Sequence, residues 1–148
     1  MLQSASAICN IYQDRNINSS LLYAGIILHD MGKTKELVGS LTTEYSLQGK
    51  LIGHISIMAA EIAVVAKRLA IPEEEMVILQ HMVLASHGRY DFGSPVLPQI
   101  MEAEILSQLD NLDAKIYAIA NALEQTSPNE FSSRILGLEN RSFYCHTK

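Results

Sequence analysis

The sequence predicts an all-α domain, a helical bundle of about five main helices. Apolar residues recur every three or four positions in five stretches, and sustained alternation of apolar and polar residues is almost absent. The chain has 148 residues, of which 48% are hydrophobic and 18% are charged. A chain of this length buries about two-thirds of its unfolded surface. We therefore expect residues 1–148 to form a single domain whose core needs neither a metal nor a disulfide.

The first helix is expected from the start of the chain to about Gln13. It opens directly in amphipathic sequence without capping residues, which predicts a truncated first helix. A second helix follows the capping residues 18–20 and runs to about Met31, with Gly32 as its C-cap. Residues 35–46 are polar and predict a loop.

A third helix is predicted over residues 47–69 from an apolar seam that includes His54. The seam residues are Leu47, Leu51, His54, Met58, Ile62, Val65 and Leu69. Pro72 and the three glutamates after it predict a fourth helix that ends at Gly88. A turn-rich loop over 88–98 precedes a fifth helix over about 99–126, and a short helix is expected near 131–136.

Charge and cysteine usage limit the classes of function. Eleven basic and 16 acidic residues give a net charge of -5 without a basic run, which disfavours stand-alone electrostatic binding of nucleic acid. Cys9 and Cys145 lie far apart and no secretory signal is visible, so reduced thiols and a cytoplasmic location are expected. The longest apolar run, residues 21–28, is shorter than the roughly 20 residues of a membrane span.

Several histidines and acids lie among apolar neighbours on the predicted helices. His29, His54 and His81 each need a buried partner there, and a hydrogen-bonded core histidine is the ordinary alternative. Asp30 follows His29, and Asp110 shares its helix face with small or apolar residues, where a salt bridge to Arg or Lys is the alternative. One divalent cation would satisfy these groups, and imidazole and carboxylate ligands suit Mn, Mg, Fe or Zn.

The segment His29-Asp30-Met31-Gly32-Lys33 resembles the HD-x-G-K signature of the HD-domain metal-dependent phosphohydrolases, an all-helical superfamily. Asp110-Asn111-Leu112 resembles the final metal-binding aspartate segment of that family. The longer segments LLYAGIILHDMGK, QHMVLASHG and EAEILSQLDNLDAK are similar to the HD domain of YhaM-type 3′→5′ exoribonucleases, over nearly the whole chain. This resemblance implies a metal centre built from His29, Asp30, His54, His87 and Asp110, and it disfavours His81.

Two departures from that family are visible. Its members carry a further metal-binding histidine on the helix before the HD pair, whereas no histidine precedes His29 here, and no OB-type nucleic-acid-binding domain is present in the sequence. Ser86 stands where the family has a histidine next to His87. Both departures predict a weakened metal site.

The expected reaction is attack of a metal-activated hydroxide on a phosphodiester. Asp30 is the candidate for bridging two ions or orienting the water, and Lys33 for neutralising a phosphate oxygen. Arg89 and Ser94 are weaker candidates for phosphate contacts, and Asp113 for support of a ligand.

The resemblance implies release of nucleoside monophosphates from the 3′ end of single-stranded RNA or DNA. A missing domain or a homo-oligomer would have to supply the surface that follows the phosphates. Two alternatives stay open. One is an HD-type nucleotidase or cyclic-dinucleotide phosphodiesterase, and the other is a catalytically impaired fragment that serves as an assembly module.

Overall fold

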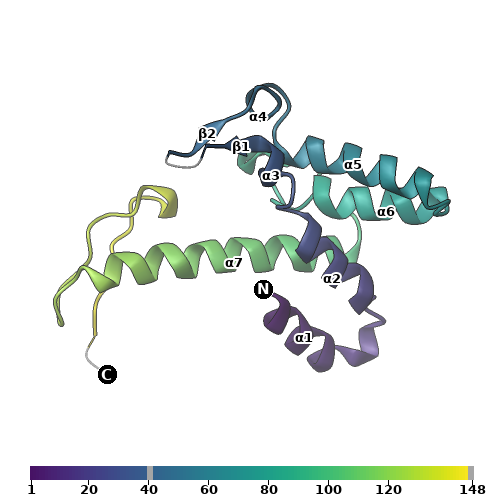
Figure 1. Cartoon of the computed structure of the whole chain (residues 1–148). Helices are drawn as coiled ribbons and strands as arrows, with labels where there is room; N and C mark the ends of the chain where they lie inside the picture. The colour runs from purple at the N-terminus through teal and green to yellow at the C-terminus, as the bar shows by residue number, and fades with distance from the viewer. Residues whose placement is uncertain (40–41, 147–148) are drawn as a thin grey trace. The chain divides into compact units, whose positions relative to one another are not determined.

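The computed structural model describes residues 1–39 and 42–146, and it is mostly helical, which confirms the predicted fold class. Its helices are α1 (Leu2–Ile11), α2 (Ser19–Leu28), α3 (Lys33–Glu36), α4 (Leu47–Leu51), α5 (His54–Arg68), α6 (Glu73–Leu84) and α7 (Met101–Glu124) (Figure 1). The chain divides into two compact units, Met1–Leu109 and Asp110–Lys148, so that α7 begins in the first and ends in the second.

Helix α2 begins where the sequence predicts but ends earlier. The Asn18 side chain accepts a hydrogen bond from the Leu21 backbone N–H at 3.0 Å, which caps the first turn. The helix ends at Leu28, not at Met31 as predicted. Gly32 is not its C-cap, since its φ of -58° is ordinary helical backbone and it precedes α3. A sharp turn over residues 29–32 therefore separates two helices.

The segment predicted as a polar loop, residues 35–46, has regular secondary structure within its described residues, 35–39 and 42–46. It contains the end of α3 and a two-stranded antiparallel sheet of β1 (Leu37–Val38) and β2 (Glu44–Tyr45). In the register of this sheet, Leu37 faces Tyr45 and Val38 faces Glu44. Its strands have two residues each, too short for the alternation that reveals a strand in a sequence.

The prediction of a single helix over residues 47–69 is wrong, because the helical backbone is interrupted between α4 and α5. Gly53 has a φ of +77°, which a right-handed helix does not allow. Leu47 and Leu51 are each 76% exposed, so they do not continue the buried face of α5. That face consists of Ile55, Ile57, Ala59, Ile62 and Ala66. The break places His54 at the start of a helix, where the prediction had it inside one.

Two apolar clusters hold the first unit together. The larger joins α1, α2, α6 and the start of α7 through Ala5, Leu22, Ile26, Met82, Ala85, Ala103, Leu106 and Leu109. The smaller joins α5 and α6, which lie side by side, through Ile55, Ile62 and Val83 (Figure 1). Helix α6 follows Pro72 as predicted but ends at Leu84 before the predicted stop at Gly88.

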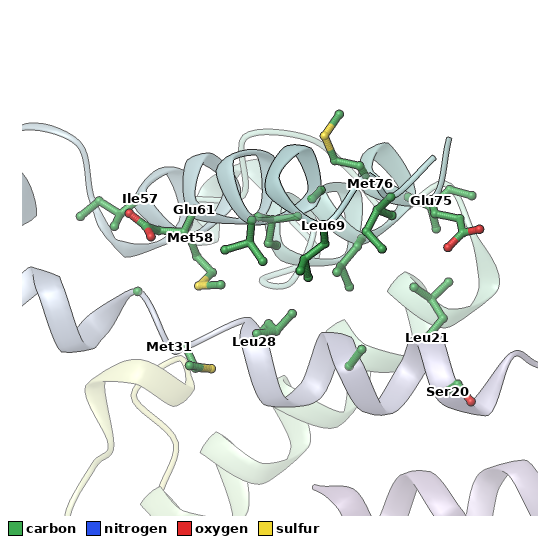
Figure 2. A pocket seen from close by; sticks show the side chains of 18 of the residues that line it. Ser20, Leu21, Leu28, Met31, Ile57, Met58, Glu61, Leu69, Glu75 and Met76 are labelled. Atoms are coloured by element: carbon green, nitrogen blue, oxygen red, sulfur yellow. The ribbon is translucent and has the colours of Figure 1, made fainter. Parts of the chain in front are cut away.

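An open groove of about 920 Å³ runs between α2 on one side and α5 and α6 on the other (Figure 2). Leu21, Leu28 and Met31 line one wall, and Met58 and Leu69 line the other. Its lining contains no histidine and is predominantly apolar. The groove therefore lacks the ligands that the sequence predicts for a metal centre.

The second unit contains the later part of α7 and the segment after it. The prediction of a helix near 131–136 is wrong. Phe131 pairs with Tyr144, and Ile135 pairs with Arg141, in isolated antiparallel β-bridges. A short 3-10 turn covers Leu136–Leu138. Among the residues that the structure describes, no helix is long and apolar enough to cross a membrane.

Candidate metal centre

His29 lies directly after α2 and is 5% exposed. Its Nδ1 lies 2.8 Å from the backbone carbonyl oxygen of Ile26. Because a carbonyl oxygen only accepts hydrogen bonds, this contact places a proton on Nδ1. In the neutral ring, the Nε2 atom then carries the lone pair.

A side chain fixes the His54 ring in the same tautomer as His29. Its Nδ1 lies 3.2 Å from Oε1 and 3.1 Å from Oε2 of Glu36, and its backbone N–H donates to Oε1 at 3.1 Å. The carboxylate therefore keeps the ring proton on Nδ1. Nε2 of His54 is buried and has no hydrogen-bond partner among the described residues.

His87, beyond the end of α6, repeats the arrangement. Its Nδ1 lies 2.8 Å from the Phe92 carbonyl oxygen, and its ring centre is 5.6 Å from that of His54. Each of the three histidines thus bonds through Nδ1 to an oxygen acceptor, which in the neutral ring puts the lone pair on Nε2. Metal-binding histidines have this pattern, because the outer hydrogen bond fixes the tautomer and the direction of the ring.

The Asp30 carboxylate lies between two of these rings. Its Oδ2 is 3.6 Å from Nε2 of His29, and its Oδ1 is 3.6 Å from Nε2 of His54. These separations exceed hydrogen-bond length, and in the neutral rings they bring lone pairs toward acceptor oxygens. A metal cation between these groups would stabilise the arrangement, because it would be attracted both to the lone pairs and to the carboxylate.

The Asp30 carboxyl group is acidic in this setting. Burial raises its pKa, but the hydrogen bond donated by Lys33, whose Nζ is 2.8 Å from the carboxylate, lowers it. The nearby His29 and His54 rings act in the same direction as Lys33. The net pKa of Asp30 lies below its ordinary value, so the group is available as an anionic ligand.

The donor set fits a divalent metal in its chemistry. Imidazole nitrogen and carboxylate oxygen are ligands for Mn, Fe and Zn, and the buried Nε2 of His54 lacks any other partner within the described part of the chain. As the side chains stand, however, no group of three or more His, Cys, Asp or Glu residues within 1–39 and 42–146 has the spacing to hold an ion. Binding therefore requires these side chains to draw closer together.

Gly32 allows the turn that carries Asp30 to pack on the start of α5. A Cβ atom at Gly32 would lie 2.1 Å from the carbonyl oxygen of His54 and 2.8 Å from its carbonyl carbon. These atoms are backbone and have little freedom to move away. The glycine of the HD-x-G-K segment is thus required by close approach, and its φ is ordinary.

His81 differs from the other three helix-associated histidines. Its Nε2 accepts a hydrogen bond from the Gln99 backbone N–H at 3.0 Å, whereas Nε2 of His54 has no hydrogen-bond partner among the described residues. Burial lowers the pKa of His81 from 6.5 because it penalises the charged ring. His81 therefore stays the less favoured ligand, as the resemblance implies.

The lowered pKa of His81 makes the stability of the fold depend on pH. The unfolded chain binds a proton at this ring more readily than the folded chain, so its contribution is present above about pH 6.5 and decreases as the pH falls through the folded pKa. We expect His81→Gln, which keeps an acceptor for Gln99, to flatten the fall in the free energy of unfolding between about pH 7 and pH 5. Urea unfolding at several pH values measures this, and equal slopes in parent and variant would contradict it.

The remaining predicted residues lie in different settings. Asp110 and Asp113 belong to α7 in the second unit, where each makes interactions of its own, and their roles stay predictions. Arg89 is exposed, with its guanidinium 5.5 Å from the centre of the Phe92 ring. Ser94 is 3% exposed and donates to the Leu84 carbonyl at 3.1 Å, so this placement gives its predicted phosphate contact no support.

Sequence reasoning missed Glu36. The sequence predicts a polar loop at this position. In the structure Glu36 is 8% exposed and accepts a hydrogen bond from His54, 18 positions later. The sequence does contain one signal: Glu36 lies one helical turn after Lys33. The prediction of a loop from residue 35 onward hides this relation. Its contact with His54 depends on the tertiary fold and leaves no local pattern.

Comparisons with known proteins show which family the chain resembles. The HD-domain family matches residues 1–115. The chain is 54% identical over 144 residues to the 3′-5′ exoribonuclease YhaM of Geobacillus sp. (strain WCH70), and 50% and 49% identical to those of Bacillus subtilis (strain 168) and Listeria welshimeri. Each alignment covers 97% of this chain and 44–45% of the relative, so the chain spans less than half of their length.

No solved structure matches the chain significantly. The family match covers more than half of the residues and includes the segment from His29 to Lys33, which confirms the resemblance seen in the sequence. The chain belongs to the HD-domain family, whose members are metal-dependent phosphohydrolases.

Proposed function

We propose that this chain carries the metal-binding and catalytic groups of a 3′→5′ exoribonuclease, which removes nucleoside monophosphates from single-stranded RNA. The observation that carries the proposal is the shared hydrogen bonding of His29, His54 and His87, each of which bonds through Nδ1 to an oxygen acceptor. The choice of RNA rests on relatives about half identical in sequence that are named exoribonucleases.

The residues of the first unit that would hold the divalent ion are His29, Asp30, His54 and His87. When bound there, the ion would lower the pKa of a coordinated water to about 7 and so supply hydroxide at neutral pH. We assign the orientation of that water to Asp30, because each of its oxygens faces a different imidazole ring. Asp110 remains a further ligand predicted from the family resemblance.

Lys33 supplies a positive charge beside this carboxylate. Its Nζ lies 2.8 Å from the Asp30 carboxylate, and its side chain is 44% exposed, so it is accessible to a substrate. A cation in that position would stabilise the negative charge that grows on a non-bridging phosphate oxygen in the transition state. We propose Lys33 as the phosphate-binding group, with Arg89 as a second contact.

Product analysis tests this function. The purified chain is incubated with Mn²⁺ and a 5′-labelled single-stranded RNA, and in parallel with a mononucleotide and a cyclic dinucleotide. We expect the RNA to shorten progressively from its 3′ end with release of nucleoside monophosphates. Turnover of the mononucleotide or the cyclic dinucleotide with intact RNA would contradict the exonuclease and favour the corresponding alternative activity.

A further inference from the structure

We infer that Glu36 is a positioning residue that fixes the tautomer and the direction of His54, so that Nε2 of His54 is presented to the metal. Nε2 of His54 is buried and unpartnered within the described chain, and Asp30 Oδ1 lies 3.6 Å away. The part of this inference that concerns metal binding rests on the function proposed above. The part that concerns the ring of His54 stands on the geometry alone.

Glu36 holds His54 at two points. Its carboxylate accepts from the His54 backbone N–H at 3.1 Å and lies 3.1–3.2 Å from Nδ1 of the ring. The backbone contact fixes the first residue of α5, and the ring contact fixes the rotation of the side chain. A carboxylate near the first turn of α5 is also favoured by the helix dipole.

Glu36 is itself fixed by its surroundings. Its carbonyl oxygen accepts a hydrogen bond from the Ser46 backbone N–H at 2.8 Å. Gly49 packs so closely that a Cβ atom there would lie 2.4 Å from the Glu36 carbonyl oxygen and 2.9 Å from its Cγ. The carboxylate therefore occupies a defined place before any ligand binds, as a pre-organised site requires.

The three histidines differ in what holds them, and this makes Glu36 testable. Backbone carbonyls of Ile26 and Phe92 hold His29 and His87, and a side-chain substitution does not remove them. His54 alone of the three bonds through Nδ1 to a side chain. Loss of the Glu36 acceptor should therefore release the His54 ring and leave the other two tautomers unchanged.

The first readout needs no metal. The ¹⁵N shifts of the histidine ring nitrogens are measured near pH 8 in the metal-free parent chain, in Glu36→Met and in Glu36→Gln. Met has a similar unbranched shape but only a weak acceptor, whereas Gln keeps one acceptor oxygen. We expect His54 to be protonated on Nδ1 in the parent, to show a large share of the Nε2–H tautomer in Glu36→Met, and a smaller but measurable share in Glu36→Gln.

The second readout is the affinity for Zn²⁺, measured by competition with a chelator. Changes to residues that support metal ligands typically weaken binding by about 10–100-fold, and we expect such a loss in Glu36→Met with partial recovery in Glu36→Gln. Glu61→Met is the matched control, since Glu61 is 44% exposed in its side chain and pairs with Lys35. It should leave the His54 tautomer and the Zn²⁺ affinity unchanged.

The outcomes separate the two claims. Folding of each variant is checked by circular dichroism, and if Glu36→Met does not fold, Glu36→Gln alone decides. A His54 ring that stays fully protonated on Nδ1 in the deciding variant overturns the role of Glu36. A parent chain that binds no Zn²⁺ while His54 changes tautomer contradicts the proposed metal centre and not the hold of Glu36 on the ring.

Discussion

Replacing Asp30 with asparagine is expected to weaken divalent-metal binding strongly and to slow RNA hydrolysis by about a thousandfold or more. The variant keeps the shape of the side chain but removes the negative charge between His29 and His54. A bound metal supplies several kcal/mol of transition-state stabilisation, and each 1.4 kcal/mol corresponds to about tenfold in rate. Metal content after dialysis and the initial rate of RNA shortening measure the two effects.

The matched control for this change is Asp14→Asn. Asp14 is 70% exposed in its side chain and pairs only with the neighbouring Arg15 in the contacts described, at 3.5 Å. It should alter neither metal content nor rate. If Asp30→Asn hydrolyses RNA as fast as the parent with the same metal content, the carboxylate is not part of the catalytic centre.

Gly32→Ala is expected to destabilise the fold by about 3 kcal/mol, the upper part of the range for an inserted methyl group. The added Cβ would overlap the backbone carbonyl of His54, which cannot move without displacing the start of α5. For a chain of this size the change corresponds to a fall in Tm of roughly 6–12 °C. Thermal unfolding followed by circular dichroism measures it.

Gly137→Ala serves as the control for the methyl group itself. A Cβ at Gly137 would meet no atom within 4 Å, and its φ lies outside the left-handed region. Its Tm should stay within a few degrees of the parent. A Gly32→Ala variant as stable as Gly137→Ala would show that the turn after Asp30 does not pack on α5 as described.

The helical character and the HD segment were predictable, because both depend on local sequence. The capping residue Asn18 and the proline before α6 mark helix starts in the sequence and in the structure alike. The break at Gly53 was not predictable from the apolar seam. Leu47 and Leu51 continue the spacing of α5 but are exposed, so periodicity alone joined two helices into one.

The candidate site also combines features that local sequence predicts with features that depend on the fold. His29 and Asp30 are consecutive residues, so the sequence itself shows this pair. The family resemblance implies His54 and His87 as further ligands. What holds these rings was not visible, because Glu36 reaches His54 across 18 residues and Phe92 holds His87 through a carbonyl oxygen that any residue would carry. Hydrogen bonds of this kind are set by the fold and leave no residue pattern.

The segment from Asp30 to Glu36 emerges as the element that organises His54. Asp30 faces Nε2 of the ring, Gly32 packs on the His54 carbonyl, and Glu36 bonds Nδ1 and the backbone N–H. A short stretch of chain therefore determines the position, the tautomer and the electrostatic surroundings of one proposed ligand.

A titration of the parent chain with Zn²⁺, followed by the ¹⁵N signals of its histidine rings, tests the metal centre most directly. Zn²⁺ has a filled d shell and no redox chemistry, so the ring signals stay observable. The account predicts that the Nε2 signals of His29, His54 and His87 change together at a single affinity while those of His81 do not. Nε2 signals of these three rings that stay unchanged with Zn²⁺ would contradict the metal centre. A proton that stays on Nε2 of His29 or His54 when Zn²⁺ is added would contradict it as well.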